Sequence, residues 1–343
     1  MKSNDFSEDT LKLTSKVLTL NPEYYTVWNQ RRRVLQYLFI TPEQPTPTDG
    51  PTPNAQDLLG QELQFLLPLL MKFPKCYWIW NHRYWVLKQI SERLQLATAQ
   101  TYWNGELVLV GKMLGRDSRN FHGWDYRRFV IQELRRLQET ARSSKSETET
   151  PPSADTSTRS STQDGAASET ITESEFAYTT KMIKGNLSNF SAWHNRSKLI
   201  PQLLDEREAN DQDRKKLFDE ELAFIQSAVF TDPYDQSLWY YHHFLMSEVS
   251  RTDGQAFVKF TDDERSECIR GEIEAIRDLL EDTDDCKWVY QSLLMYSAQL
   301  SKVAAIDELV TSHDLRSWLL QLRKLDPMRS KRWDDWEQSL GIP

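Results

Sequence analysis

A tryptophan-centred segment recurs seven times along this chain of 343 residues, and this repetition constrains the possible folds more than any other feature. In the four strongest copies an aromatic residue precedes the tryptophan by three positions, an arginine follows it by three, and an apolar pair follows at six and seven. These copies are "YYTVWNQRRRVL" with Trp28 and Arg31, "CYWIWNHRYWVL" with Trp80 and Arg83, "NFHGWDYRRFVI" with Trp124 and Arg127, and "NFSAWHNRSKLI" with Trp193 and Arg196.

Three further copies continue the series. "DQSLWYYHHFLM" carries Trp239, with His242 where arginine is expected, and weaker copies centre on Trp288 and Trp333. The intervals between the seven tryptophans are 52, 44, 69, 46, 49 and 45 residues. A period of roughly 45 residues is typical of two helices per repeat. The sequence therefore predicts an all-α solenoid of about seven antiparallel helix hairpins.

Each tryptophan segment follows an apolar segment of helical period, so the tryptophan helix is the second of its hairpin. Within that helix, Tyr77, Trp80, Tyr84 and Leu87 are spaced to form one stripe. Arg83 lies beside the stripe, where its long side chain could reach a carbonyl or a carboxylate of the next hairpin. We therefore predict that the repeated tryptophans and most of the arginines serve packing.

Two segments interrupt the array. Residues 41–54 are rich in proline and predict a long loop. Residues 141–170 are rich in serine and threonine with almost no apolar side chain, which predicts a disordered insertion. Repeats one to three then occupy residues 1–140 and repeats four to seven occupy residues 171–343, in one continuous solenoid domain.

Composition excludes several classes of protein. With 42 basic and 51 acidic residues, the net charge of −9 disfavours a general nucleic-acid binder. The three cysteines have neither metal-ligand nor disulfide spacing, which favours a reduced, cytoplasmic location. The sequence contains no phosphate-binding glycine loop, nucleophile elbow, zinc-spaced cluster or membrane segment. By itself the chain is therefore a poor candidate for an enzyme. Its sequence also predicts no metal site.

The repeated helix "xYxxWxxRxxxL" resembles the repeat of protein prenyltransferase α subunits, over roughly residues 9–340. Among these it is most similar to the Rab geranylgeranyltransferase (type II) α subunit, because of "IPQL" at Ile200–Leu203 and "DPYDQSLW" at Asp232–Trp239. The length suits the compact fungal-type form, without the immunoglobulin-like and leucine-rich-repeat domains of animal members, and the basic helix that commonly precedes the first repeat is missing. The resemblance implies a right-handed crescent of hairpins.

The resemblance also implies a heterodimeric transferase. Such an enzyme moves a geranylgeranyl group from its diphosphate to C-terminal cysteines of Rab GTPases. The β subunit holds the zinc and most of the isoprenoid pocket, so no cofactor is expected in this chain. A Rab escort protein presents the Rab substrate and docks on the α subunit, which we expect here at repeats four and five. Neither nucleic acid nor membrane insertion is expected.

Candidate site residues follow from the same resemblance. Lys75, in the "PKxYxxW" context, matches a lysine of the family that contacts the diphosphate, and an ammonium there would offset the developing negative charge. Tyr77 could donate its hydroxyl to the same oxygens. Asn120, Phe121 and His122 match the third-repeat "NYH" positions that line this region, although Phe121 lacks the hydroxyl of the usual tyrosine. Without the resemblance, Lys75 would be interpreted as a solvated lysine at a helix start.

Two other functions remain open from the sequence. The chain could be the α subunit shared by farnesyltransferase and geranylgeranyltransferase type I, with the same role for Lys75 but a different β partner and CaaX substrates. The fourth and fifth repeats argue against it. The chain could also be a non-catalytic helical-repeat scaffold of tetratricopeptide type, but that array repeats about every 34 residues.

Overall fold

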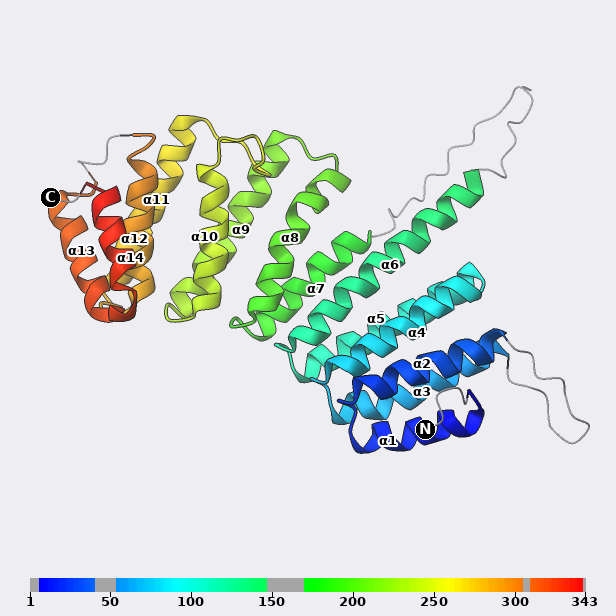
Figure 1. Ribbon diagram of the computed structural model, residues 1–343. Helices are drawn as coiled ribbons and strands as arrows, with labels where there is room; N and C mark the ends of the chain where they lie inside the picture. Colours follow the sequence, from blue (N-terminus) through cyan, green and yellow to red (C-terminus); the bar gives the residue numbers. More distant parts are fainter. Residues whose placement is uncertain (1–5, 41–53, 147–169, 305–308, 342–343) are drawn as a thin grey trace, which may run out of the picture. The chain divides into compact units, whose positions relative to one another are not determined.

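The computed structural model describes residues 6–40, 54–146, 170–304 and 309–341, and the regular elements in these ranges are all helices (Figure 1). The chain divides into two compact units, Met1–Ala166 and Ala167–Pro343. The first unit contains α1 (Glu8–Leu20), α2 (Tyr25–Ile40), α3 (Ala55–Lys72), α4 (Tyr77–Arg93), α5 (Leu96–Arg116) and α6 (Phe121–Ser146). The second contains α7 (Ile171–Gly185), α8 (Phe190–Glu206), α9 (Asp211–Thr231), α10 (Gln236–Ser250), α11 (Asp262–Leu280), α12 (Lys287–Leu300), α13 (Ser312–Leu325), the short 3-10 helix η1 (Pro327–Arg329) and α14 (Ser330–Ser339).

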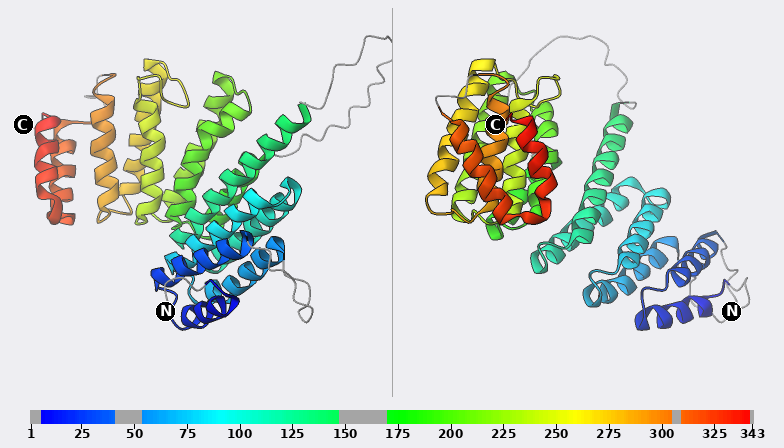
Figure 2. Two further views of the ribbon diagram at one scale, coloured as in Figure 1. Left: turned by 45° about the vertical axis from the view of Figure 1, so that its right-hand side comes forward. Right: turned by 60° about the vertical axis from the view of Figure 1, so that its left-hand side comes forward.

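Consecutive helices pack together in pairs, from α1 with α2 to α13 with α14, so the predicted all-α architecture of seven hairpins is confirmed. Within each unit the hairpins stack in chain order (Figure 2). The second helices of neighbouring hairpins also touch: α2 with α4 and α4 with α6 in the first unit, and α8 with α10 and α10 with α12 in the second. That the two units continue one solenoid domain remains a prediction.

Helix α6 extends to Ser146 and so enters the segment 141–170 that was predicted as a disordered insertion. Near this end of α6, Thr140 and Ser143 donate their hydroxyls to carbonyls one turn back, as such side chains can within a helix. Thr170 caps α7 by accepting the Glu173 N–H. The remainder of the insertion, and the proline-rich segment except for its last residue, lie outside the described residues.

The repeated tryptophans are buried, as a packing role requires, and the first five also tie their helices to the preceding turns. The indole N–H donates to the backbone carbonyl six residues earlier, in the turn that joins the two helices. The pairs are Trp28–Pro22 at 2.7 Å, Trp80–Pro74 at 2.9 Å, Trp124–Ser118 at 2.9 Å, Trp193–Leu187 at 2.8 Å and Trp239–Pro233 at 2.7 Å.

In the sixth hairpin a tyrosine replaces this tryptophan. The Tyr290 hydroxyl donates to the Asp284 carbonyl, six residues earlier, at 2.8 Å. Tyr290 is the fourth residue of α12, as Trp28 is of α2. The sequence alignment on Trp288 is therefore wrong by two residues, because hydrogen-bond geometry rather than residue type defines the position.

The repeated arginines join one hairpin to the next. Arg31 of α2 forms a bidentate ion pair with Glu62 of α3, at 2.7 and 2.6 Å, and donates to the Leu11 carbonyl of α1. Arg83 of α4 pairs in the same way with Glu106 of α5, at 2.6 and 3.0 Å. A carboxylate of the next hairpin is thus reached, as predicted, while the carbonyl belongs to the arginine's own hairpin.

The second unit repeats this arrangement with one variation. Arg196 of α8 forms a bidentate pair with Glu221 of α9, at 2.6 and 2.5 Å. In the fifth hairpin His242 takes the place of arginine, and its Nε2 lies 2.7 Å from Glu272 of α11. Arg127 of α6 is buried like the other arginines of the motif.

The stripe predicted on α4 is not buried along its whole length. Trp80 is 4% exposed, whereas Tyr77, its first member, is 50% exposed. The same contrast separates the first residues of α2, α6 and α8 from the tryptophans that follow them, since Tyr25 and Phe190 are about half exposed and Phe121 is 65% exposed. Each of these aromatic residues starts its helix and lies at the edge of the hairpin, beyond the cover of neighbouring helices.

Candidate functional site

The five predicted site residues gather at the exposed edge of two neighbouring hairpins in the first unit. Lys75 lies in the turn before α4 and Tyr77 is the first residue of α4. Asn120 directly precedes α6, whose first two residues are Phe121 and His122. Because α4 packs against α6, the two turns come together, and we call these five residues the α4–α6 edge site.

Lys75 presents its ammonium to solvent. Its side chain is 72% exposed, and Nζ lies 3.4 Å from a carboxylate oxygen of Asp117, the residue that follows α5. An exposed ion pair of this kind contributes about 0–1 kcal/mol. The ammonium is therefore available to another anion at little cost.

Three aromatic rings border this lysine turn. The Tyr77 and His122 rings lie 6.4 Å apart between centroids, and the His122 and Phe121 rings 4.0 Å apart. Partial burial lowers the pKa of His122, although the carboxylates of Asp125 and Glu23 oppose this change. His122 thus adds a polar ring to the edge that resists protonation.

Asn120 differs from its neighbours because its side chain is already engaged within the chain. It is 3% exposed, its Nδ2 donates to the Pro74 carbonyl at 3.0 Å, and its Oδ1 accepts the backbone N–H groups of His122 and Gly123. The Pro74 carbonyl is also the acceptor for the Trp80 indole. Asn120 therefore holds the lysine turn against the start of α6.

Cysteines make the corresponding link in other hairpins. The Cys76 thiol lies 3.6 Å from the Pro22 carbonyl, and the Cys286 thiol 3.1 Å from the Pro233 carbonyl. Burial raises the pKa of Cys76 to about 11, which keeps the thiol protonated as a donor. Sequence reasoning gave Cys76 no role, and the structure gives it a packing role.

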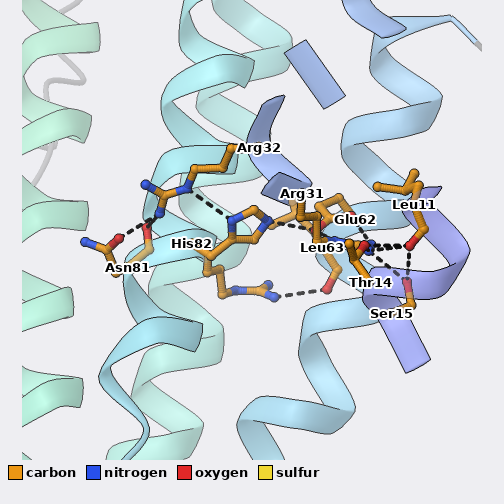
Figure 3. Close-up of polar contacts among 10 residues, drawn as sticks. Leu11, Thr14, Ser15, Arg31, Arg32, Glu62, Leu63, Asn81 and His82 are labelled. Atoms are coloured by element: carbon orange, nitrogen blue, oxygen red, sulfur yellow. Dashed lines mark hydrogen bonds and ion pairs between the residues drawn. The ribbon is translucent and has the colours of Figure 1, made fainter. Parts of the chain in front are cut away.

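Sequence reasoning missed two residues linked to the α4–α6 edge site, one directly and one through the other. Asn81, one turn after Tyr77, donates its amide to the Tyr77 hydroxyl at 3.2 Å. Arg32 of α2 donates to the side-chain oxygen of Asn81 at 2.7 Å and to Nδ1 of His82 at 3.2 Å (Figure 3). Arg32 lies 49 residues before Asn81 in the sequence, so no local pattern reveals the contact.

The hairpins of this chain match a repeat found in known proteins. A family repeat described as "Protein prenyltransferase alpha subunit repeat" matches the first five of them, at residues 7–38, 59–90, 103–134, 172–203 and 218–249. The geranylgeranyl transferase type-2 subunit alpha of Candida albicans is 31% identical, over 97% of this chain and 86% of its own. The chain belongs to the protein prenyltransferase α-subunit family. It is a prenyltransferase subunit.

Other prenyltransferase relatives support the same family assignment. The geranylgeranyl transferase type-2 subunit alpha of Schizosaccharomyces pombe is 34% identical, over 99% of this chain and 88% of its own. Its Homo sapiens counterpart is 34% identical over 77% of this chain and 38% of its own. A solved chain of Candida albicans protein geranylgeranyltransferase-I complexed with GGPP has the same fold, with a TM-score of 0.59, 21% identity and coverage of 97% of this chain and 84% of that one.

This prenyltransferase subunit has a second surface feature, in its other unit. Side chains of α8 and α10 line a hollow of about 340 Å³, which we call the aromatic groove. At its rim, the half-exposed rings of Phe190 and Tyr240 lie 6.1 Å apart between centroids. The lining residues are Phe190, Trp193, His194, Ser197, Lys198, Ser237, Tyr240, Tyr241 and Phe244.

The described residues contain no group of three or more histidine, cysteine, aspartate or glutamate side chains placed to hold a metal ion. None of the helices in the described part of the chain is long and apolar enough to cross a membrane.

Proposed function

We propose that this chain is the α subunit of a heterodimeric protein geranylgeranyltransferase of type II, acting in the cytoplasm on C-terminal cysteines of Rab GTPases. The observation that carries the proposal is its 30–34% identity, over nearly the whole chain, to fungal proteins named geranylgeranyl transferase type-2 subunit alpha. A β subunit would supply the zinc and most of the isoprenoid pocket. Geranylgeranyl diphosphate is the co-substrate.

The α4–α6 edge site is suited to one part of this reaction. Transfer of the isoprenoid to a thiolate releases diphosphate, on which negative charge develops as the carbon–oxygen bond breaks. Lys75 would stabilise that charge, since its ammonium is exposed and only weakly held by Asp117. Tyr77 would donate its hydroxyl to the same oxygens, and His122 and Phe121 would border them. The β subunit closes the site against this edge.

The decisive experiment is single-turnover transfer by the heterodimer with Lys75→Ala. Loss of one positioned charge-stabilising group costs about 10²–10³ in rate. We expect a loss of this size, with unchanged assembly on size-exclusion chromatography. Lys72→Ala is the matched control, because Lys72 is an exposed lysine three residues earlier, at the end of α3. Transfer at the wild-type rate by the Lys75 variant would show that this residue does not serve the reaction.

We further propose that the Rab escort protein docks on the aromatic groove. The groove lies in the fourth and fifth hairpins, where the family resemblance leads us to expect the escort protein, and its half-exposed rings offer apolar area to a partner side chain.

Titration calorimetry with the escort–Rab complex tests this docking site. We expect Phe190→Ser to weaken binding about tenfold or more. Phe230→Ser is the control, because Phe230 is equally exposed but lies on α9, outside the groove. Equal affinities of the two variants would place the escort protein elsewhere.

Identification of the β subunit that co-purifies with the tagged chain separates the remaining possibilities. A type-II β subunit supports the proposal. A CaaX-type β subunit would retain the role of Lys75 but change the substrate, and absence of any β subunit would leave a helical scaffold.

A further inference from the structure

The Tyr77 hydroxyl belongs to a chain of hydrogen bonds that begins in the core of the first hairpins. Arg32 donates through Nη2 to Oδ1 and to the backbone carbonyl of Asn81, at 2.7 and 3.0 Å. Asn81 in turn donates through Nδ2 to the Tyr77 hydroxyl oxygen at 3.2 Å. Figure 3 shows the first of these steps, with Arg32 between Asn81 and His82.

The chemistry of Arg32 determines which way the Asn81 amide faces. A guanidinium has only donors, so the group that it meets on Asn81 must be the carbonyl oxygen. The NH₂ end of the amide is then directed to Tyr77. A reversed amide would set two donors against each other, and Tyr77 would face a carbonyl instead.

The orientation of this amide decides where the Tyr77 proton can go. A phenol has one proton to donate and lone pairs to accept with. The Asn81 NH₂ group donates to a lone pair of the Tyr77 oxygen and has no acceptor of its own. The Tyr77 hydroxyl therefore cannot donate its proton to this group. Within the described residues no hydrogen bond uses this proton, and the side chain is 50% exposed. The proton is therefore free for an acceptor outside the chain.

Arg32 itself is held from the other side. Its Nε donates to Nδ1 of His82 at 3.2 Å, which requires that Nδ1 carry the lone pair. Nε2 of His82 then carries the proton and donates to Glu62 at 2.8 Å. Glu62 also receives the bidentate pair from Arg31. Arg32 has no ion-pair partner in the described ranges, so these neutral acceptors, with the centroid of the Trp85 ring 5.4 Å from its guanidinium carbon, hold it in position.

We propose that Arg32 and Asn81 are positioning residues for the transfer reaction, which orient the Tyr77 hydroxyl so that it donates to the departing diphosphate. This inference rests on the role proposed above for Tyr77. It adds that the orientation is set from the neighbouring hairpin, through the amide of Asn81.

The first hairpin offers an internal control. Tyr25 and Asn29 occupy the positions in α2 that Tyr77 and Asn81 occupy in α4. Both are exposed, and no hydrogen bond joins their side chains within the described residues. The coupling of Arg32, Asn81 and Tyr77 is thus not a general property of the repeat. Asn29→Asp is a matched substitution that adds the same charge without reaching the hydroxyl.

The test is a double-mutant cycle on single-turnover transfer by the full heterodimer. Asn81→Asp replaces the NH₂ donor with a carboxylate oxygen, which would accept the Tyr77 proton and withdraw it from the diphosphate. We expect Asn81→Asp to slow transfer by roughly tenfold or more, about as much as Tyr77→Phe, because each removes one hydrogen bond to a charged oxygen. In the Tyr77→Phe background the same substitution should have no further effect.

Several outcomes would overturn the inference. One is transfer at the wild-type rate by Asn81→Asp. Another is an equal loss of rate from Asn81→Asp in the wild-type and Tyr77→Phe backgrounds, which would mean that Asn81 acts without the hydroxyl. Asn81→Leu provides a second variant. We expect it to slow transfer less than Asn81→Asp does, and only in the background that retains Tyr77. If Tyr77→Phe itself is fully active, this inference fails together with the role of Tyr77, while Lys75→Ala still tests the proposed function separately. Asn29→Asp should transfer at the wild-type rate.

Discussion

The interior of α4 and its exposed first turn perform different tasks within one hairpin. Trp80 and Arg83 are almost completely buried and bind the turn behind them and the hairpin ahead. Lys75 and Tyr77, only a few residues away, are half exposed or more and contribute little to packing. The contrast teaches that one hairpin combines a buried packing interior with an exposed edge, and it is to this edge that the proposed function assigns the chemistry. Substitutions should therefore separate stability from rate.

The largest effect on stability is expected from Arg83→Ala. It would leave the carboxylate of Glu106 buried without its partner, which typically costs about 3–5 kcal/mol. Urea unfolding of the isolated chain measures this free energy. Lys75→Ala, at the exposed end of the same hairpin, should change it by less than about 1 kcal/mol. Similar losses in the two variants would remove the distinction between interior and edge.

The next effect is a pH dependence of the buried interior. Burial by itself would raise the pKa of Glu62, but hydrogen bonds from His82 and Arg31 outweigh it and lower the pKa to about 2. Burial also lowers the pKa of His82. In both cases the unfolded chain binds a proton that the folded chain does not, so stability falls as the pH falls, below about 6.5 for His82 and below about 4.5 for Glu62.

Glu62→Gln tests this dependence. Between pH 5 and pH 3 the carboxylate alone should account for about 2 kcal/mol of lost unfolding free energy in the wild-type chain. The variant should start less stable, because Arg31 loses its bidentate partner, and should then decline less steeply over this window. Urea titrations at several pH values compare the slopes. A decline as steep as that of the wild type would assign the acid sensitivity to other groups.

Asn120 lies on the boundary between the two regions, and its substitution should affect both stability and rate. Asn120→Ala removes a helix cap and one donor to the Pro74 carbonyl, at a cost of about 1–2 kcal/mol. It should also slow transfer, because the lysine turn loses its link to α6. Asn189→Ala is the matched control, since Asn189 is buried and caps α8 in the same position of the fourth hairpin. That variant should melt at a similarly lowered temperature but transfer normally in an assay that does not depend on the escort protein.

The smallest effect is expected from Asp117→Asn, which frees the Lys75 ammonium. Stability should change by less than about 1 kcal/mol, because the pair is exposed. The heterodimer should bind inorganic diphosphate up to a few times more tightly at low salt, and the difference should shrink as salt screens the charges. Weaker binding by the variant would indicate that Asp117 orients the lysine rather than competing for it.

Much of the fold could be predicted from the sequence because it depends on local periodicity. The spacing of Trp28, Trp80 and Trp124 reveals a repeat of roughly 45 residues that contains two helices. Bulky apolar side chains at helical spacing within it must be buried. The failures have a common origin. Tyr77 shares the helical face of Trp80 yet is exposed, because periodicity does not show where a hairpin has its edge. Tyr290, and not Trp288, bonds to the turn in the sixth hairpin, because periodicity does not show which side chain makes that hydrogen bond.

The sequence by itself determined the all-α repeat, the buried role of its tryptophans and arginines, and the family to which the chain belongs. Only the tertiary structure decided which carboxylate each arginine meets, and that Arg32 reaches Asn81 from 49 residues away. The physical reason is that a repeat motif records what each helix buries, whereas ion pairs and hydrogen bonds between hairpins depend on how far one helix is shifted along the next. That shift arises from the packing of many side chains together, so no single segment contains it.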